Sequence, residues 1–374
     1  MIDRSKPDYL LLLVVLILIG MGMVMVYSAS AILALDRIGN SMAFAKMQAI
    51  WVTVSLISIL VLTKIDYHKL EKLSLLFLIL SFGCLVAVLF FPSVKGVNRW
   101  IKLGPVTFQP SELFKLSLIL FLAHSLNKRK MRITELEFVL IPYFLIFGVA
   151  AVLLMKEPHL GAVLLMGTIV FGMLFVAGTK IKHFLMIVAP VVLGLFVLVF
   201  LFGYKKPRVE DYLKSMEHPL KGSYQMAQSV LALSSGELLG AGLGEGKAKL
   251  FFLPEPHTDF IFATTGEELG FLGSSAILVL FFILALRGFA IARKASDDFG
   301  CLLAFGITFS IFMGALINAG VVVGIFPTTG LPMPFLSYGG SSLFFTALGI
   351  GILLNISRQT KYIPSGHIIS KIGL

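Results

Sequence analysis

Long apolar runs recur along the whole chain, separated by short polar segments. Runs of roughly 17 to 25 residues are long enough to cross a bilayer as helices. The pattern therefore predicts an all-α polytopic membrane protein that forms one integral membrane domain over residues 1–374. We predict about ten transmembrane helices, at residues 9–30, 44–63, 73–91, 111–126, 138–155, 159–177, 182–202, 260–286, 299–325 and 338–357.

The first apolar run could pass for a signal peptide, because basic residues precede it and the small residues Ser28-Ala29-Ser30 follow it. Its uninterrupted length from Tyr9 to Val26 exceeds that of the usual signal-peptide core, and further spans follow. We therefore predict that it is retained as the first transmembrane helix.

The basic residues predict how the helices are oriented. With the N-terminus inside, both termini are cytoplasmic, and few basic residues fall in the short external loops, as the positive-inside rule requires. The basic residues then assigned to the cytoplasmic side are Arg4, Lys6, Lys64, Lys69, Lys72, Lys128, Arg129, Lys130, Arg132, Lys180, Lys182, Arg287, Arg293, Lys294, Arg358, Lys361 and Lys371.

Two external loops are unlike simple connectors. Segment 92–110 mixes Trp100 and Phe108 with glycine, proline and three cations. Segment 203–259 is a large external loop between helices seven and eight. Within it, Met226, Val230 and Leu233 lie near helical spacing, which favours a short amphipathic helix at the membrane interface.

Composition supports the membrane assignment and narrows the chemistry. The chain is 57% hydrophobic and 14% charged, and its mean hydropathy is +0.95, far outside the range of soluble domains. The two cysteines, Cys84 and Cys301, lie inside apolar runs, which argues against a disulfide framework or a cysteine-based zinc site. A net charge of +11 then reflects topology and attraction to anionic lipid rather than nucleic acid as a partner.

The stretch LPEPHTDFIFATTGEELG (253–270) crowds charged residues at the start of the predicted eighth helix. One interpretation is structural, with Thr258 or Asp259 as a helix cap. The other is functional, since ionisable groups at membrane depth are costly and usually have a role. We favour a catalytic role for Asp259, with His257 as an assisting residue.

The two glutamates of this stretch differ in their predicted orientation. On a continuous helix, Glu267 lies about 80° around from Asp259 and Glu268 about 180°. Glu267 is therefore the better candidate for a supporting group, and we expect Glu268 to face away.

A second polar cluster lies in FQPSELFKLSL (108–118). Ser111 is expected to cap the helix that begins there. Glu112 and Lys115 are three residues apart, on one helical face, and close enough to pair. The pair is either structural, or it lines a polar cavity in which Lys115 meets a phosphate and Glu112 orients it.

Arg99 in GVNRWIKLG and Arg208 in YKKPRVEDY are external cations beside aromatic residues. Arginine suits bidentate phosphate recognition. The alternative for each is contact with lipid headgroups, with Trp100 and Tyr204 anchoring the loops at the interface.

The segment FPTTGLPMPFLSYGGSS (326–342) opens the last predicted helix with small residues. These permit close helix packing, and a Gly- and Ser-rich helix start can also present backbone N–H groups to an anion. The candidates are Ser337, Gly339, Gly340 and Ser341. No Walker-type phosphate loop, dinucleotide fingerprint or His-rich metal motif occurs in the sequence, so no metal ligand is assigned.

Taken together, these stretches resemble the SEDS family (shape, elongation, division and sporulation), which includes FtsW, RodA and SpoVE. The resemblance runs in order through VYSASA, GVNRWIKLG, FQPSELFKL, YQMAQSVLAL, FLPEPHTDFIFATTGEELG and LPMPFLSYGGSS, nearly the whole chain. GELLGAGLG, TGEELG and GVNRWI are more similar to the FtsW and SpoVE branch than to RodA.

The resemblance implies an enzyme of the bacterial cytoplasmic membrane, a glycosyltransferase that polymerises peptidoglycan glycan strands from lipid II. It implies that the aspartate of the HTDF motif, here Asp259, is essential, and that the active site is external. The implied partners are lipid II, the nascent glycan strand, a class B penicillin-binding protein that acts as transpeptidase, and other division or elongation membrane proteins.

Three positions depart from the family pattern. Many members have Asp and Thr where this chain has His159 and Ala162, and many FtsW proteins have Lys where it has Thr329. We therefore do not carry His159 or Thr329 over as site residues.

The chemistry implied is glycosyl transfer, which needs a base for the attacking hydroxyl and cations for the departing pyrophosphate. Asp259 is the predicted base, and Arg99, Lys115 and Arg208 are the predicted pyrophosphate contacts. No cofactor is assigned, although a divalent cation could share the task. The rival interpretations are a lipid-linked precursor flippase or transporter, and a non-catalytic division scaffold.

Overall fold

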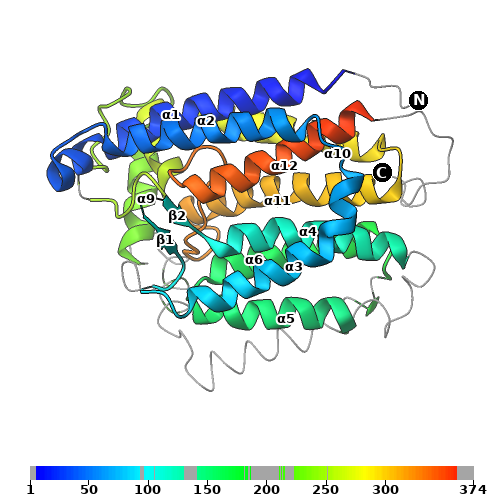
Figure 1. Ribbon diagram of the computed structural model, residues 1–374. Helices are drawn as coiled ribbons and strands as arrows, with labels where there is room; N and C mark the ends of the chain where they lie inside the picture. Colours follow the sequence, from blue (N-terminus) through cyan, green and yellow to red (C-terminus); the bar gives the residue numbers. More distant parts are fainter. Residues whose placement is uncertain are drawn as a thin grey trace.

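The computed structural model describes residues 6–92, 97–104, 106–129, 141–180, 182–183, 186, 210, 212, 214, 223–250 and 252–359. Most of these residues lie in helices that run side by side, with a small hairpin at one end of the bundle (Figure 1). The helices are α1 (Tyr9–Ile38), α2 (Ala43–Leu62), α3 (His68–Val88), α4 (Pro110–Lys128), α5 (Ile141–Lys156), α6 (Leu160–Val176), α9 (Tyr224–Ser235), α10 (Ile261–Arg293), α11 (Asp298–Val322) and α12 (Gly340–Arg358).

Most of the predicted spans correspond to these helices, so the helical, polytopic membrane class is confirmed. Six of the helices, namely α1, α2, α3, α10, α11 and α12, are long and apolar enough to cross a membrane. The apolar helices α5 and α6 are shorter. The predicted seventh span, 182–202, lies almost entirely outside the described residues.

Burial sorts the helices into inner and outer members of the bundle. In α11 and α12, 72% and 78% of the most apolar stretch is buried, against 17% in α2. The side chains that α2 exposes include Ile50, Val54, Ile57 and Leu60. Such apolar faces are suited to contact with lipid, while α11 and α12 form the centre against which the other helices pack.

A two-stranded antiparallel hairpin lies within segment 92–110, which we predicted to be an external loop. Strands β1 (Ile101–Leu103) and β2 (Val106–Phe108) pair with Ile101 opposite Phe108. Figure 1 shows the hairpin near α9, at the end of the bundle opposite the start of α1. The expected short helix around Met226 and Leu233 is confirmed as α9.

The helix caps differ from the predicted ones. The N-cap of α4 is Gln109, with Pro110 as the first helical residue, so Ser111 lies inside the helix. The N-cap of α10 is Phe260, whose side chain makes no capping bond. Thr258 and Asp259 therefore precede the cap, and neither caps the helix.

Helix α10 contains a break at Gly270, where φ is 68° and ψ is −168°. The turn after α9 packs into this break, and a Cβ at Gly270 would lie 2.3 Å from the backbone nitrogen of Gly240. The Ala241 N–H donates to the Glu267 carbonyl at 2.9 Å, and the Phe271 N–H donates to the Glu237 carbonyl at 2.9 Å. The neighbouring turn thus satisfies backbone groups that the break frees.

Candidate functional site

The segment before α10 and the segment before α12 are joined by hydrogen bonds. The Ser337 hydroxyl donates to the Thr258 carbonyl at 2.7 Å and accepts from the Met333 N–H at 2.8 Å. The Tyr338 N–H donates to the His257 carbonyl at 2.8 Å. Two stretches that are about eighty residues apart in sequence therefore form one surface around Asp259.

Helix α11 fixes the same two segments through one amide side chain. Asn318 is buried, and its Nδ2 donates to the Asp259 carbonyl at 2.8 Å and to the Leu331 carbonyl at 2.7 Å. A single buried side chain thus holds the backbone of Asp259 against the proline-rich segment 326–338.

The Asp259 carboxylate and the Arg99 guanidinium lie beside the same point of the backbone. A Cβ built on Gly330 would lie 3.4 Å from Asp259 Oδ2 and 3.5 Å from Arg99 Nη1. Gly330 has a φ of 70°, in the left-handed region that glycine adopts without strain. The absence of a side chain at Gly330 leaves room between a carboxylate and a cation.

Arg99 is held in place by the connection between α5 and α6. Its Nε donates to the Glu157 carbonyl at 3.0 Å, and its Nη2 donates to the Pro158 carbonyl. The guanidinium therefore joins the hairpin segment to the start of α6, with Nη1 turned toward Gly330.

Glu157 is a buried carboxylate that sequence reasoning did not single out. The residue is fully buried, and neither carboxylate oxygen has a hydrogen-bond partner in the structure. Burial raises the pKa of Glu157 to about 8, although the nearby Arg99 charge opposes this shift. Its local sequence, KEPH, gave no sign that a buried group would lie next to Arg99.

The predicted pair Glu112 and Lys115 forms an ion pair, with Lys115 Nζ 2.6 Å from Glu112 Oε2. Both side chains line a cavity of about 20 Å³, between α4, α6, α11, α12 and residues Leu331 and Pro332. The cavity has room for about one water molecule. Gly330, beside Asp259 and Arg99, directly precedes Leu331, so the ion pair and the carboxylate both lie near one short segment.

The small residues at the start of α12 act in packing. The Ser341 hydroxyl accepts from the Gln109 N–H at 3.1 Å and donates to the Thr107 carbonyl at 3.0 Å. Gly339 is the N-cap of α12, and a Cβ at Gly340 would lie 2.1 Å from the Trp51 indole. The close-packing alternative is therefore realised at Gly340, and the hydroxyls of Ser337 and Ser341 serve to join segments.

His257 is buried beneath the joined segments. Its ring packs against Phe44 and Tyr338, with ring centroids 4.9 Å and 5.7 Å away. The side chain therefore supports the backbone that carries Asp259 from an aromatic pocket formed with α2.

Both glutamates of α10 face the turn after α9. The Glu267 carboxylate accepts N–H bonds from Lys247 and Ala248, the shorter at 2.7 Å. Glu268 is also buried. The predicted orientation assumed a helix that includes Asp259, whereas Asp259 precedes α10, so its angle to these residues is not set by helix geometry.

Glu268 belongs to a buried ion pair. Lys249 Nζ lies 2.6 Å from Glu268 Oε1, and the Ser28 hydroxyl of α1 lies 2.7 Å from the same oxygen. Both charged side chains are at most 3% exposed. The pair joins α1 and α10 to the turn after α9.

The remaining predicted contact, Arg208, lies outside the described residues. Among the residues that the structure does describe, no group of three or more His, Cys, Asp or Glu side chains is arranged to hold a metal ion.

The helices and this charged site define a multi-pass membrane protein with polar groups gathered at one end of its bundle. The family model of FtsW, RodA and SpoVE, described as "Cell cycle protein", matches residues 8–362. The chain belongs to this family.

Relatives of known name match nearly the full chain. The "Probable peptidoglycan glycosyltransferase FtsW" of Geobacter metallireducens is 40% identical over 363 residues, 96% of each protein. "Stage V sporulation protein E" of Bacillus subtilis is 40% identical over 367 residues, 96% of this chain and 99% of that protein. Both belong to the FtsW and SpoVE branch that the sequence favoured.

Solved structures share the fold. A chain from "Structural coordination of polymerization and crosslinking by a peptidoglycan synthase complex" superposes with a TM-score of 0.76 at 28% identity, covering 94% of this chain and 98% of that one. The "Rod shape determining protein RodA" of Thermus thermophilus superposes with a TM-score of 0.68 at 26% identity, covering 96% and 98%.

Proposed function

We propose that the protein is a peptidoglycan glycosyltransferase that polymerises glycan strands from lipid II, with Asp259 as its catalytic base. The catalytic assignment rests on one observation: the Asp259 carboxylate and the Arg99 guanidinium both lie beside Gly330. A base and a cation at one place are what this reaction needs.

The reaction forms one glycosidic bond and breaks one bond to phosphate. A sugar hydroxyl attacks the anomeric carbon of the second substrate, and Asp259 takes the hydroxyl proton. The bond from the anomeric carbon to the lipid pyrophosphate breaks, and the leaving group carries away the electron pair. Arg99, Lys115 and Arg208 stabilise its negative charge, with Glu112 orienting Lys115.

Other groups position this machinery. His257 and Ser337 hold the two segments that carry Asp259 and Gly330, and Ser341 joins the start of α12 to the hairpin. Glu267 holds the turn after α9. No metal ligand is assigned among the described residues; a divalent cation, if bound, would share the charge of the pyrophosphate.

The same proposal places the protein in the bacterial cytoplasmic membrane as a single domain of ten transmembrane helices. Both termini are cytoplasmic, segment 203–259 is external and lies between helices seven and eight, and Asp259 faces the outside. A class B penicillin-binding protein cross-links the new strand, an assignment supported by the similarity to a chain of a peptidoglycan synthase complex. Other division membrane proteins complete the assembly.

The experiment is polymerisation of labelled lipid II by the purified protein in detergent, resolved by strand length. Detergent leaves no second compartment, so a flippase or a scaffold gives no product. Arg99→Gln and Lys115→Gln should each lower turnover by about tenfold or more, since charged hydrogen bonds contribute roughly 1.5–3 kcal/mol. Absence of strands with the wild-type protein and its transpeptidase partner would contradict the proposal.

A further inference from the structure

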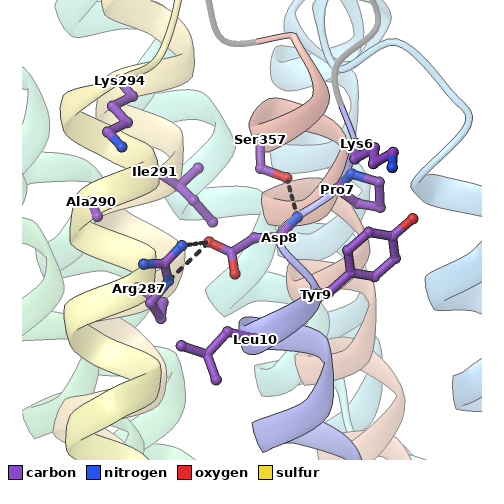
Figure 2. A pocket seen from close by; sticks show the side chains of 10 residues that line it. All are labelled: Lys6, Pro7, Asp8, Tyr9, Leu10, Arg287, Ala290, Ile291, Lys294 and Ser357. Atoms are coloured by element: carbon purple, nitrogen blue, oxygen red, sulfur yellow. Dashed lines mark hydrogen bonds and ion pairs between the residues drawn. The ribbon is translucent and has the colours of Figure 1, made fainter.

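A second charged cavity lies at the opposite end of the bundle from Asp259. Asp259 precedes the first residue of α10, whereas Arg287 and Lys294, at the far end of that helix, line this cavity. It has a volume of about 330 Å³ and is bounded by the start of α1 and the ends of α10 and α12. Figure 2 shows the side chains that surround it.

Among the described residues that line the cavity, Asp8 supplies the one carboxylate, and it is already engaged. Asp8 Oδ2 lies 2.6 Å from Arg287 Nη2 and 3.0 Å from Arg287 Nε. Asp8 Oδ1 caps α1 by accepting the Leu11 N–H at 3.0 Å. This carboxylate balances Arg287, so it does not balance the other two cations of the cavity.

Those two cations are Lys6 and Lys294. They come from the segment before α1 and from the C-cap of α10, and both are exposed. In the part of the chain that the structure describes, neither ammonium forms an ion pair with a carboxylate. The cavity therefore carries a net positive charge and suits an anion.

The cavity continues into an apolar surface. Tyr9 and Leu10 line it and are 60% and 46% exposed. Leu13 and Ile17 continue the exposed stripe along α1, at the spacing of one helical face. A free phosphate would use only the basic end, whereas a phospholipid would place its headgroup at the lysines and its acyl chains along this stripe.

We propose that this cavity binds the headgroup of an anionic phospholipid. Basic residues at a membrane surface attract such headgroups, and basic pockets between transmembrane helices bind them. The phosphodiester lies between Lys6 and Lys294, beside the Arg287–Asp8 pair, and an acyl chain follows Leu10, Leu13 and Ile17. The site is separate from the glycosyltransferase site and does not depend on its chemistry.

The test measures phospholipid retention by the purified protein with native mass spectrometry, comparing phosphatidylglycerol with phosphatidylcholine. Wild-type protein should retain phosphatidylglycerol preferentially. The double variant Lys6→Gln/Lys294→Gln should lose about 30-fold of that preference, because each lysine near an anionic surface contributes roughly 1 kcal/mol. It keeps the Arg287–Asp8 pair, and its thermal unfolding should match the wild type.

The matched control is Lys64→Gln/Lys69→Gln, which removes the same charge from exposed lysines outside the cavity. It should keep the preference. Equal retention by the cavity variant and the wild type would overturn the proposal. Displacement of phosphatidylglycerol by an equal concentration of inorganic phosphate would overturn the lipid assignment, because it would show that the site recognises only the anion.

Discussion

At the scale of single residues, the charged side chains of the site differ in whether they have bonding partners. Arg99 is held by two backbone carbonyls, and Lys115 is neutralised by Glu112. Glu157, in contrast, is buried beside Arg99 with no hydrogen-bond partner in the structure. A buried carboxylate without partners is costly when charged, so it is a group whose protonation the fold controls.

Glu157 should make the stability of the protein fall as the pH rises. Its pKa is raised from the ordinary 4.5 to about 8 in the folded state, so between these values the folded protein binds a proton that the unfolded chain has lost. The stabilisation is fully present below about pH 4.5 and is lost as the pH rises toward 8. Glu157→Gln should flatten this dependence, measured as the unfolding temperature in detergent across the window.

The control for Glu157 is the exposed Glu245, whose change to Gln should leave the slope as in the wild type. A wild-type stability that rises across this pH window, with Glu157→Gln unchanged in slope, would show that Glu157 is not buried in its protonated form.

At the scale of elements, the break in α10 is imposed by a neighbouring segment. Nothing in the local sequence LGFLG distinguishes Gly270 from a glycine in a continuous helix. The left-handed backbone there is required because the turn at Gly240 occupies the space of a Cβ. Sequence patterning therefore predicted the helix and missed its break.

Gly270→Ala should destabilise the protein by about 2 kcal/mol or more, through left-handed strain and the clash with the turn. Gly20→Ala in α1 is the matched control. A Cβ at Gly20 meets nothing within 4 Å, so alanine there should be neutral or slightly stabilising. Thermal unfolding of the two variants compares them, and equal unfolding temperatures would show that the break is not constrained.

The buried ion pair of Lys249 and Glu268 should stabilise the contact between α10 and the turn after α9. Lys249→Ala should cost about 3–5 kcal/mol, because it leaves the Glu268 charge buried without its cation. Lys249→Met combined with Glu268→Gln should recover much of that loss, since no unpaired charge remains. Unfolding measurements decide this, with the exposed Lys247→Ala as control. A double variant as unstable as Lys249→Ala would contradict the argument.

At the scale of the whole molecule, the two ends of the bundle carry different chemistry. One end gathers Asp259, Arg99 and the ion pair of α4 around the segment before α12. The other end has the basic cavity between α1, α10 and α12 (Figure 2). This polarity agrees with our two proposals, in which a lipid-linked substrate reacts at one membrane face and an anionic phospholipid binds at the other.

Much of this arrangement could be predicted from the sequence, because the apolar periodicity of a membrane protein is a strong local signal. The helices, the Glu112–Lys115 pair and the motif containing Asp259 are all visible in local patterns. Other features depend on residues far apart in the sequence, so local patterns do not predict them. These are the contacts of Arg99 with residues 157–158, the role of Asn318 and the turn that binds Glu267. The hairpin was missed because its strands have only three residues each.

The catalytic role of Asp259 is tested most directly by measuring the polymerisation rate of purified Asp259→Asn with labelled lipid II. A general base contributes roughly 100- to 10,000-fold, so the variant should be slower by about 100-fold or more while its unfolding temperature stays near that of the wild type. Asp36→Asn, which changes an exposed carboxylate of α1, should polymerise at the wild-type rate. Normal strand synthesis by Asp259→Asn would show that Asp259 is not the catalytic base.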